Sequence, residues 1–167
     1  MELQFDPLEL AGLPGDLAAA LAYWQQLSGA KDKIPSWSDF ELQNIPPRVL
    51  VTTHVTDVVE KWEDYRIRFW GSGFVDIHNQ EATHQWVSEI DPPELGAAVV
   101  ENIAAVVDAG EPRAYTILLQ TPGRPQKFQV VLRLPLSDDG QTVNHVVTVS
   151  EFPQGRYWSQ DAFKDLG

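Results

Sequence analysis

Cysteine is absent from this chain of 167 residues, and its absence removes several kinds of chemistry. Without a thiolate the protein forms no disulfide, no zinc–thiolate site and no iron–sulfur cluster, and it has no cysteine nucleophile. A cysteinyl–flavin photoadduct is excluded for the same reason. Any function must therefore rest on nitrogen and oxygen side chains and on packing.

Basic residues are also scarce. The chain has 12 Lys and Arg against 24 Asp and Glu, which gives a formal net charge of −12 at pH 7. Such a surface repels phosphate backbones, and no basic stripe interrupts the acidity, so we expect no nucleic-acid partner.

Long apolar runs are missing as well. No stretch approaches the roughly 20 apolar residues that span a bilayer. Residues 1–6 show no basic region followed by an apolar segment, which is the pattern of a secretory signal. We therefore expect a cytoplasmic protein with no membrane partner.

Motifs of catalysis and nucleotide binding are not found either. Gly71-Ser72-Gly73 comes nearest to a nucleophile elbow but lacks the flanking pattern, and there is no Gly-x-Gly-x-x-Gly or P-loop. The carboxylates are numerous but scattered, so a chance pair would not indicate acid–base catalysis. We expect a binding protein and not an enzyme.

The composition that remains is typical of one globular domain, with 43% hydrophobic and 22% charged residues. We divide the chain into a lead-in of residues 1–47, a core domain of residues 48–152 and a tail of residues 153–167. The end of the lead-in, from Lys31 to Pro47, holds three prolines that favour a loop.

The first half of the chain predicts one helix and two strands. A helix capped by Asp16 and ended by Gly29 carries Leu17, Leu21 and Trp24 on one face. Strands are expected at residues 48–55 and 65–70. In the second of these, strict alternation places Tyr65, Ile67 and Phe69 on one face and Arg66, Arg68 and Trp70 on the other.

The second half predicts helices and then strands. A short helix is expected at residues 74–78, and a longer one runs from the capping sequence that begins at Asp91 to Gly110. Strands at residues 114–120, 128–134 and 143–151 are joined by short turns, so they are expected to be antiparallel neighbours. The tail from Arg156 onward suits a final helix.

This order predicts an α+β fold with a five-stranded antiparallel sheet. Helices are inserted between strands 2 and 3 and cover one face of the sheet, and an N-terminal helix flanks it.

The element order and several local sequences resemble the PAS sensor fold, and in particular a bacterial PAS-like branch of largely unassigned function. The resemblance is carried by Tyr65 to Gly71, by Gly110-Glu111-Pro112 and, most closely, by Leu134 to Gly140 followed by Val143. The segment from Asn79 to Trp86 departs from the family, because the Gly-Arg-Asp turn and later Thr-Gly are replaced. That segment borders the pocket in PAS folds, so the resemblance names no ligand.

The resemblance implies a sensory or interaction module in signalling or regulation. Its partners would be a small-molecule ligand, a protein of a signalling pathway and a second copy in a homodimer. Trp24 and Trp158 are candidates for the dimer interface, since aromatic residues are enriched at interface cores.

Aromatic residues are the most informative feature of the composition, with six tryptophans. One interpretation is core packing. The other is a cavity for a small apolar or aromatic ligand, with an arginine orienting its polar end. Haem-binding PAS domains use a histidine of the inserted helical region, and the resemblance therefore adds His78 and His84 as candidates. No His-x-x-x-His pair supports a preformed site, so we predict no metal site. The candidate ligand-binding residues are Arg68, Trp70, Phe74, His78, His84, Trp86 and Arg133, and the identity of any cofactor stays open.

Two alternatives accompany this hypothesis. A small NTF2-like α+β enzyme would require a buried carboxylate next to His54 or His145. A ligand-free interaction domain would fill its pocket with its own side chains. Fold analogy alone does not separate the last alternative from a sensor.

Overall fold

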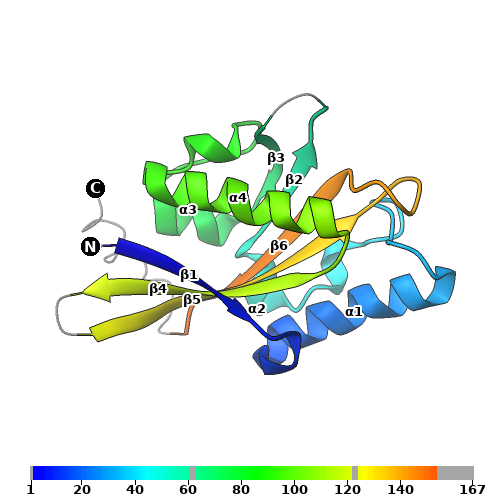
Figure 1. Cartoon of the computed structure of the whole chain (residues 1–167), viewed down its shortest axis with the longest axis horizontal. Helices are drawn as coiled ribbons and strands as arrows, with labels where there is room; N and C mark the ends of the chain where they lie inside the picture. Colours follow the sequence, from blue (N-terminus) through cyan, green and yellow to red (C-terminus); the bar gives the residue numbers. More distant parts are fainter. Residues whose placement is uncertain (1, 61–62, 122–123, 154–167) are drawn as a thin grey trace.

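The computed structural model describes residues 2–60, 63–121 and 124–153 (Figure 1). The helix predicted from Arg156 onward lies outside the described residues, and so do Trp62 and Trp158. None of the described helices is both long enough and apolar enough to cross a membrane.

The core is one antiparallel sheet of six strands in the order β1-β4-β5-β6-β2-β3. Five of its strands occupy the regions that the sequence predicted, and the inserted helices lie between the second and third of them. The strands are β1 Glu2–Leu8, β2 Thr53–Val58, β3 Tyr65–Trp70, β4 Arg113–Thr121, β5 Arg124–Leu136 and β6 His145–Glu151.

The prediction of five strands is wrong by one, because β1 pairs with β4 along the edge of the sheet. Pro7 hides this strand in the sequence, since proline cannot donate to a ladder. An edge strand tolerates it, because one side of the strand has no partner. Segments of the predicted lead-in therefore contribute to the same core as the rest of the chain.

Helices cover both faces of the sheet, which corrects the prediction of helices on one face. Figure 1 shows α3 (Ser72–His78) and α4 (Pro93–Ala109) on one side and α1 (Gly15–Lys31) on the other. The buried side of α1 includes Leu17, Leu21 and Trp24, as its helical spacing predicted. The indole of Trp24 donates a hydrogen bond to the Pro135 carbonyl at 2.8 Å, so this residue is engaged inside the fold.

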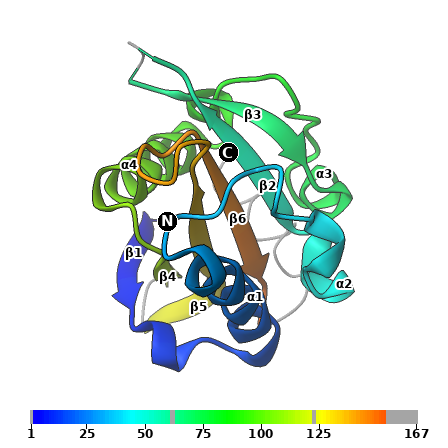
Figure 2. The same ribbon diagram turned by 90° about the vertical axis from the view of Figure 1, so that its right-hand side faces the viewer.

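Of the strand predicted at residues 48–55, only residues 53–55 lie in β2, which continues to Val58. The first residues of the predicted strand belong to α2, a single turn at Pro47–Leu50, because prolines at the N-cap and first helical position favour a helix start. The Thr53 hydroxyl donates to the Val49 carbonyl at 2.8 Å and closes this turn before β2 begins. In Figure 2, α2 lies next to α3 at one end of the sheet.

A β-bulge in β3 changes the face on which Trp70 lies. Val55 pairs with Phe69 but Thr56 pairs with Ile67, so Arg68 is an extra residue in the ladder. The alternation reverses at that point. Trp70 therefore joins Ile67 on the face covered by α3 and α4, although strict alternation placed the two residues on opposite faces.

Two glycines fix the junction between β3 and α3 against α2. A Cβ on Gly71 would lie 2.3 Å from the Val51 carbonyl oxygen, and one on Gly73 would lie 2.7 Å from it. The amide of Gly73 donates to that same oxygen at 2.7 Å. The close approach of two backbones explains why glycine is needed here.

We predict that Gly71→Ala lowers the free energy of unfolding by about 1–3 kcal/mol, because its methyl group overlaps a backbone atom that cannot rotate away. The matched control is Gly29→Ala on the exposed side of α1, where a Cβ meets nothing within 4 Å. That change is expected to stabilise the protein by about 0.5–1 kcal/mol through helix propensity. Urea unfolding of both variants measures the difference, and equal effects would contradict the proposed close contact.

Candidate functional site

A small cavity of about 30 Å³ lies between the sheet and the two helices α3 and α4. Its wall on the side of the helices is apolar and includes Leu95 and Val99 from α4, and Val131 of β5 adds an apolar residue on the side of the sheet. A cavity of this size has room for on the order of two water molecules. It is far smaller than the roughly 300–1,000 Å³ of a pocket for a drug-sized ligand.

Polar side chains form the opposite wall of the cavity. They come from the three adjacent strands β2, β5 and β6. The two polar residues of β5 are four positions apart and the two of β6 are two positions apart, and residues at even spacing on a strand share one face of the sheet. All of them are buried. These residues are His54, Gln129, Arg133, Thr148 and Ser150.

Arg133 is the most unusual of these residues, because its side chain is buried and no acid among the described residues pairs with it. The residue is 1% exposed. Its cross-strand neighbours are Arg113 in β4 and Thr148 in β6, so the register brings no carboxylate opposite it. Nη1 donates to the Thr148 hydroxyl at 2.8 Å, whereas Nε has no partner among the described residues.

Burial lowers the pKa of Arg133 to about 10, so the side chain remains a cation at neutral pH. Buried charges in proteins are ordinarily paired, since an unpaired one costs several kcal/mol of desolvation. Among the described residues, no carboxylate compensates the charge of Arg133 at this cavity.

Two further polar atoms of the cavity wall lack partners among the described residues, namely His54 Nδ1 and Ser150 Oγ. Burial holds the pKa of His54 well below its ordinary value, and the charge of Arg133 adds to this effect, so the imidazole is neutral. Buried polar atoms nearly always have a hydrogen-bond partner. Three such atoms border one cavity, which makes this cavity the candidate binding site.

Aromatic rings fill the rest of the space between the sheet and α3. The rings of Trp70 and Phe74 stack with their centroids 4.8 Å apart, and the His54 ring lies 5.7 Å from each. The indole of Trp70 donates to the Gln80 carbonyl at 3.0 Å, which fixes its orientation. These contacts explain why the cavity is small.

His78 closes the cavity at the C-terminal end of α3. Its Nδ1 lies 3.1 Å from the Asp91 carbonyl oxygen, which requires the tautomer that carries the proton on Nδ1 when the ring is neutral. Burial lowers the pKa of His78 to about 4, although the Asp91 carbonyl partly opposes this shift.

Four of the seven residues predicted for the site line this cavity, and three lie elsewhere. The four are Trp70, Phe74, His78 and Arg133. Arg68 lies on the opposite face of the sheet, where it pairs with Asp57 at 2.7 Å. His84 is exposed in a loop, and Trp86 lies beside the edge of β3 with the Arg66 guanidinium 5.5 Å from its ring.

Sequence reasoning did not select His54, Gln129, Thr148 or Ser150 for the site. The signal was present in β5, where apolar residues alternate with Gln129 and Arg133. Such a pattern ordinarily indicates a solvent-facing side. Because helices cover both faces here, the polar side of the alternation is buried.

An acid–histidine pair does occur, but it lies away from the cavity. His145 Nδ1 is 2.8 Å from Asp57 Oδ1, on the side of the sheet that α1 covers, and Arg68 shares the same carboxylate oxygen. Burial alone would raise the pKa of Asp57, but the hydrogen bonds from His145 and Arg68 outweigh it and hold this pKa below its ordinary value. The carboxylate is partly exposed. Asp57 is thus the carboxylate that the enzyme alternative sought next to His145, but it is partly exposed and lies outside the cavity.

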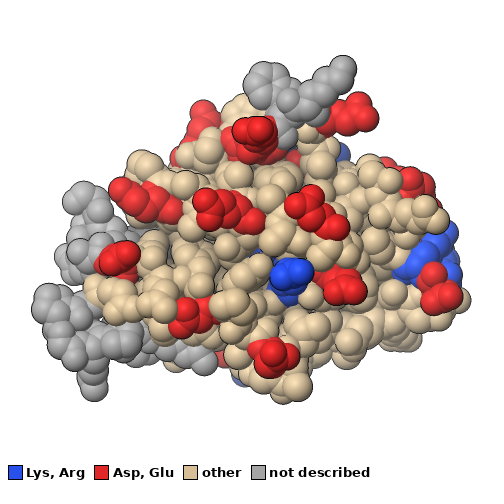
Figure 3. Space-filling view, in the orientation of Figure 1, with Lys and Arg blue, Asp and Glu red and all other residues tan. Residues whose placement is uncertain are grey.

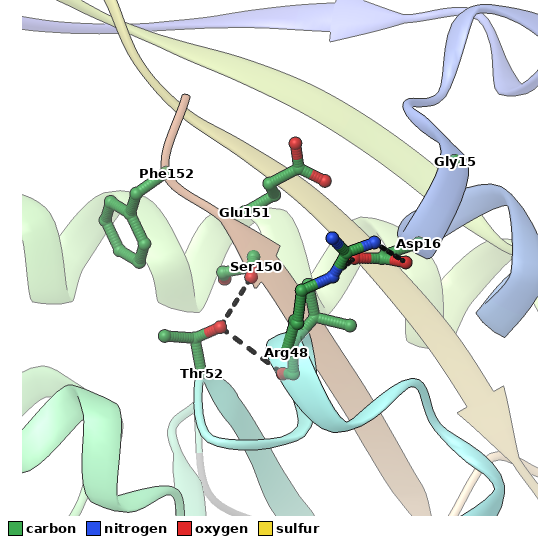
Figure 4. Close-up of a pocket in the computed structure, with 8 residues that line it drawn as sticks. Gly15, Asp16, Arg48, Thr52, Ser150, Glu151 and Phe152 are labelled. Carbon is green, nitrogen blue, oxygen red and sulfur yellow. Dashed lines mark hydrogen bonds and ion pairs between the residues drawn. The ribbon is translucent and has the colours of Figure 1, made fainter. Parts of the chain in front are cut away.

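A second hollow of about 440 Å³ is open to solvent at the end of α2 (Figure 4). Two of its polar side chains are partnered: Arg48 pairs with Asp16 at 3.0 Å, and the Thr52 hydroxyl donates to the Ser150 carbonyl at 2.6 Å. Ser150 borders this hollow as well as the small cavity. Among the described residues no group of three or more His, Asp and Glu side chains could hold a metal ion. The small cavity therefore remains the candidate site.

Comparisons with known proteins give structural likenesses and no family. No protein-family model matches the chain, and no curated protein matches it. The fold is similar to the solved structure of an RNA-binding light-oxygen-voltage receptor, with 14% sequence identity and a TM-score of 0.42. The alignment covers 99% of this chain and 42% of that protein. A likeness at this level carries no functional argument, and the observed α+β sheet is consistent with the PAS-like arrangement that the sequence resemblance implied.

We predict that His78 makes the protein less stable as the pH falls from about 6.5 to 4. The unfolded chain binds a proton on this residue below pH 6.5, whereas the folded protein does so only near pH 4, so protons favour unfolding within that window. The loss for this residue is at most about 3 kcal/mol. Urea unfolding across the pH range should show that His78→Gln flattens the decline, and parallel curves for the two proteins would contradict the shifted pKa.

We also predict that Arg133→Met raises the free energy of unfolding by about 1–4 kcal/mol in ligand-free buffer, because it removes an unpaired buried charge while keeping side-chain volume. The control is Arg66→Met at an exposed position, which is expected to change stability by less than about 0.5 kcal/mol. Urea unfolding measures both. A large loss of stability in Arg133→Met would show that the cation already has a partner in the folded protein.

Proposed function

We propose that this protein is a PAS-like sensory module that acts in regulation by binding a small polar molecule in the cavity between the sheet and the helices α3 and α4. The observation that carries the proposal is the set of buried polar atoms without partners, on Arg133, His54 and Ser150, around one cavity.

The arrangement of the fold supports this proposal. Without the edge strand β1, the sheet has the order β4-β5-β6-β2-β3, and α3 and α4 connect β3 to β4. These are the five strands and inserted helices that the PAS resemblance implies. The cavity also lies where that resemblance places a ligand, between the inserted helices and the sheet.

The size of the cavity argues for a polar ligand in place of the apolar or aromatic one that the sequence suggested. Trp70 and Phe74 fill the space that an aromatic ligand would take, and the remaining volume is about 30 Å³. These side chains serve as the cover of the site, and the polar wall of the sheet supplies the recognition.

A ligand-free interaction domain is the second candidate, and the near-complete filling of the space by aromatic rings favours it. Figure 3 shows a strongly acidic surface over α4, where Glu94, Glu101 and Asp108 are exposed. In either case we propose that the protein acts through a protein partner or a second copy of the chain. Because Trp24 is buried against the sheet, a homodimer would use another surface.

The test is a thermal-shift screen of the purified protein against small polar metabolites of up to about six non-hydrogen atoms. A ligand that binds the folded state raises the melting temperature by mass action. We expect saturable stabilisation by at least one compound, together with slower hydrogen exchange in α3, α4 and β5. Absence of any hit, with an unchanged exchange pattern, would overturn the sensor proposal and leave the interaction domain.

A further inference from the structure

Hydrogen-bond donors predominate among the polar groups of the cavity wall that lack partners. His54 Nδ1, which also lacks a partner among the described residues, donates when the neutral ring carries its hydrogen on that atom. Arg133 Nε–H and the Ser150 hydroxyl have no partner among the described residues. The Thr148 oxygen accepts from Arg133, so its hydroxyl hydrogen remains to donate, and no described group accepts it. The residues that carry these three donors line the same small cavity, and one of them, Arg133, is positively charged.

This predominance of donors distinguishes an anion from water. A water molecule offers two acceptor sites and brings two hydrogens that need acceptors of their own. An ionised carboxylate brings no hydrogen and accepts about four hydrogen bonds, and its charge compensates a guanidinium directly. The donor set of the cavity matches the carboxylate.

The dimensions and the apolar wall restrict the carboxylate further. About 30 Å³ admits only a few non-hydrogen atoms. The wall opposite the polar strands is formed by Leu95 and Val99 of α4, which suits a hydrogen atom or a methyl group at the other end of the ligand.

We infer that the cavity binds a small monocarboxylate of the size of formate or acetate, with its anionic group held by Arg133, Thr148 and Ser150. This inference rests on the proposed sensory function and names the class of ligand that the site would detect. Ligand binding would neutralise the buried cation without any change in protonation, since both partners are already ionised at neutral pH.

The experiment compares formate and acetate with their neutral isosteres, formamide and acetamide. Purified full-length protein is studied at pH 7 by differential scanning fluorimetry and isothermal titration calorimetry. Ionic strength is held constant with a bulky organic sulfonate, and chloride is a further arm. We expect saturable stabilisation by formate or acetate and none by either amide.

The variants test the residues. Arg133→Met is expected to weaken carboxylate binding on the order of 10- to 100-fold, because a charge-assisted hydrogen bond is lost. Ser150→Ala keeps its backbone contact with Thr52 and is expected to weaken binding about 5-fold. Arg66→Met, an arginine exposed outside the cavity, is expected to leave binding unchanged. Unchanged binding in Arg133→Met would overturn the inference even if Ser150→Ala failed to fold.

The outcomes also separate this inference from the function on which it rests. Equal stabilisation by acetate and acetamide would show a neutral ligand, which overturns the carboxylate and retains the sensor. Stabilisation by chloride alone would show that the cavity binds a halide, which likewise overturns the carboxylate inference and retains the sensor proposal. No response to any of these probes or to the wider screen would overturn both proposals and leave a water-filled cavity.

Discussion

The burial of both faces of the sheet is the constraint on which the rest of this structure depends. The face under α1 is filled by apolar side chains, among them Leu17, Leu132 and Val149. The face under α3 and α4 combines apolar residues with His54, Arg133 and Ser150. A two-layer fold would leave such a polar row in water. Here α4 lies over it, and the polar atoms that have no partner among the described residues define the candidate site.

Local regularities in the sequence were sufficient to predict the elements that depend on them. The apolar spacing in α4 and the closing Gly110, which adopts a φ of 64°, predicted this helix. Its predicted bounds differ from the observed ones by two residues at the N-terminal end and by one at the C-terminal end. The strands β4 to β6 follow from alternation and short turns. Arg133 was predicted for the site because an arginine could orient the polar end of a ligand. That no described carboxylate lies opposite it depends on the strand register, which pairs Arg133 with Arg113 and Thr148.

The features that sequence reasoning missed depend on contacts between distant segments. The edge strand β1 requires the free side of β4, and the turn α2 is stabilised by burial of Val49. The bulge at Arg68 depends on pairing with β2, and it decides which face receives Trp70. No pattern within residues 65–70 shows this reversal, because strict alternation describes the segment equally well.

The backbone contact between Gly71 and Val51 has a mechanical consequence. It joins the start of α3 to the end of α2 without an intervening side chain, so α3 cannot shift by a fraction of an ångström without moving α2. The next connection is the ion pair between Arg48 of α2 and Asp16 of α1. A continuous path of contacts therefore passes around the end of the sheet, from the helices above the cavity to the helix on the far side. Under the proposed sensory function, this path would carry the effect of a buried ligand to a surface that the ligand never touches.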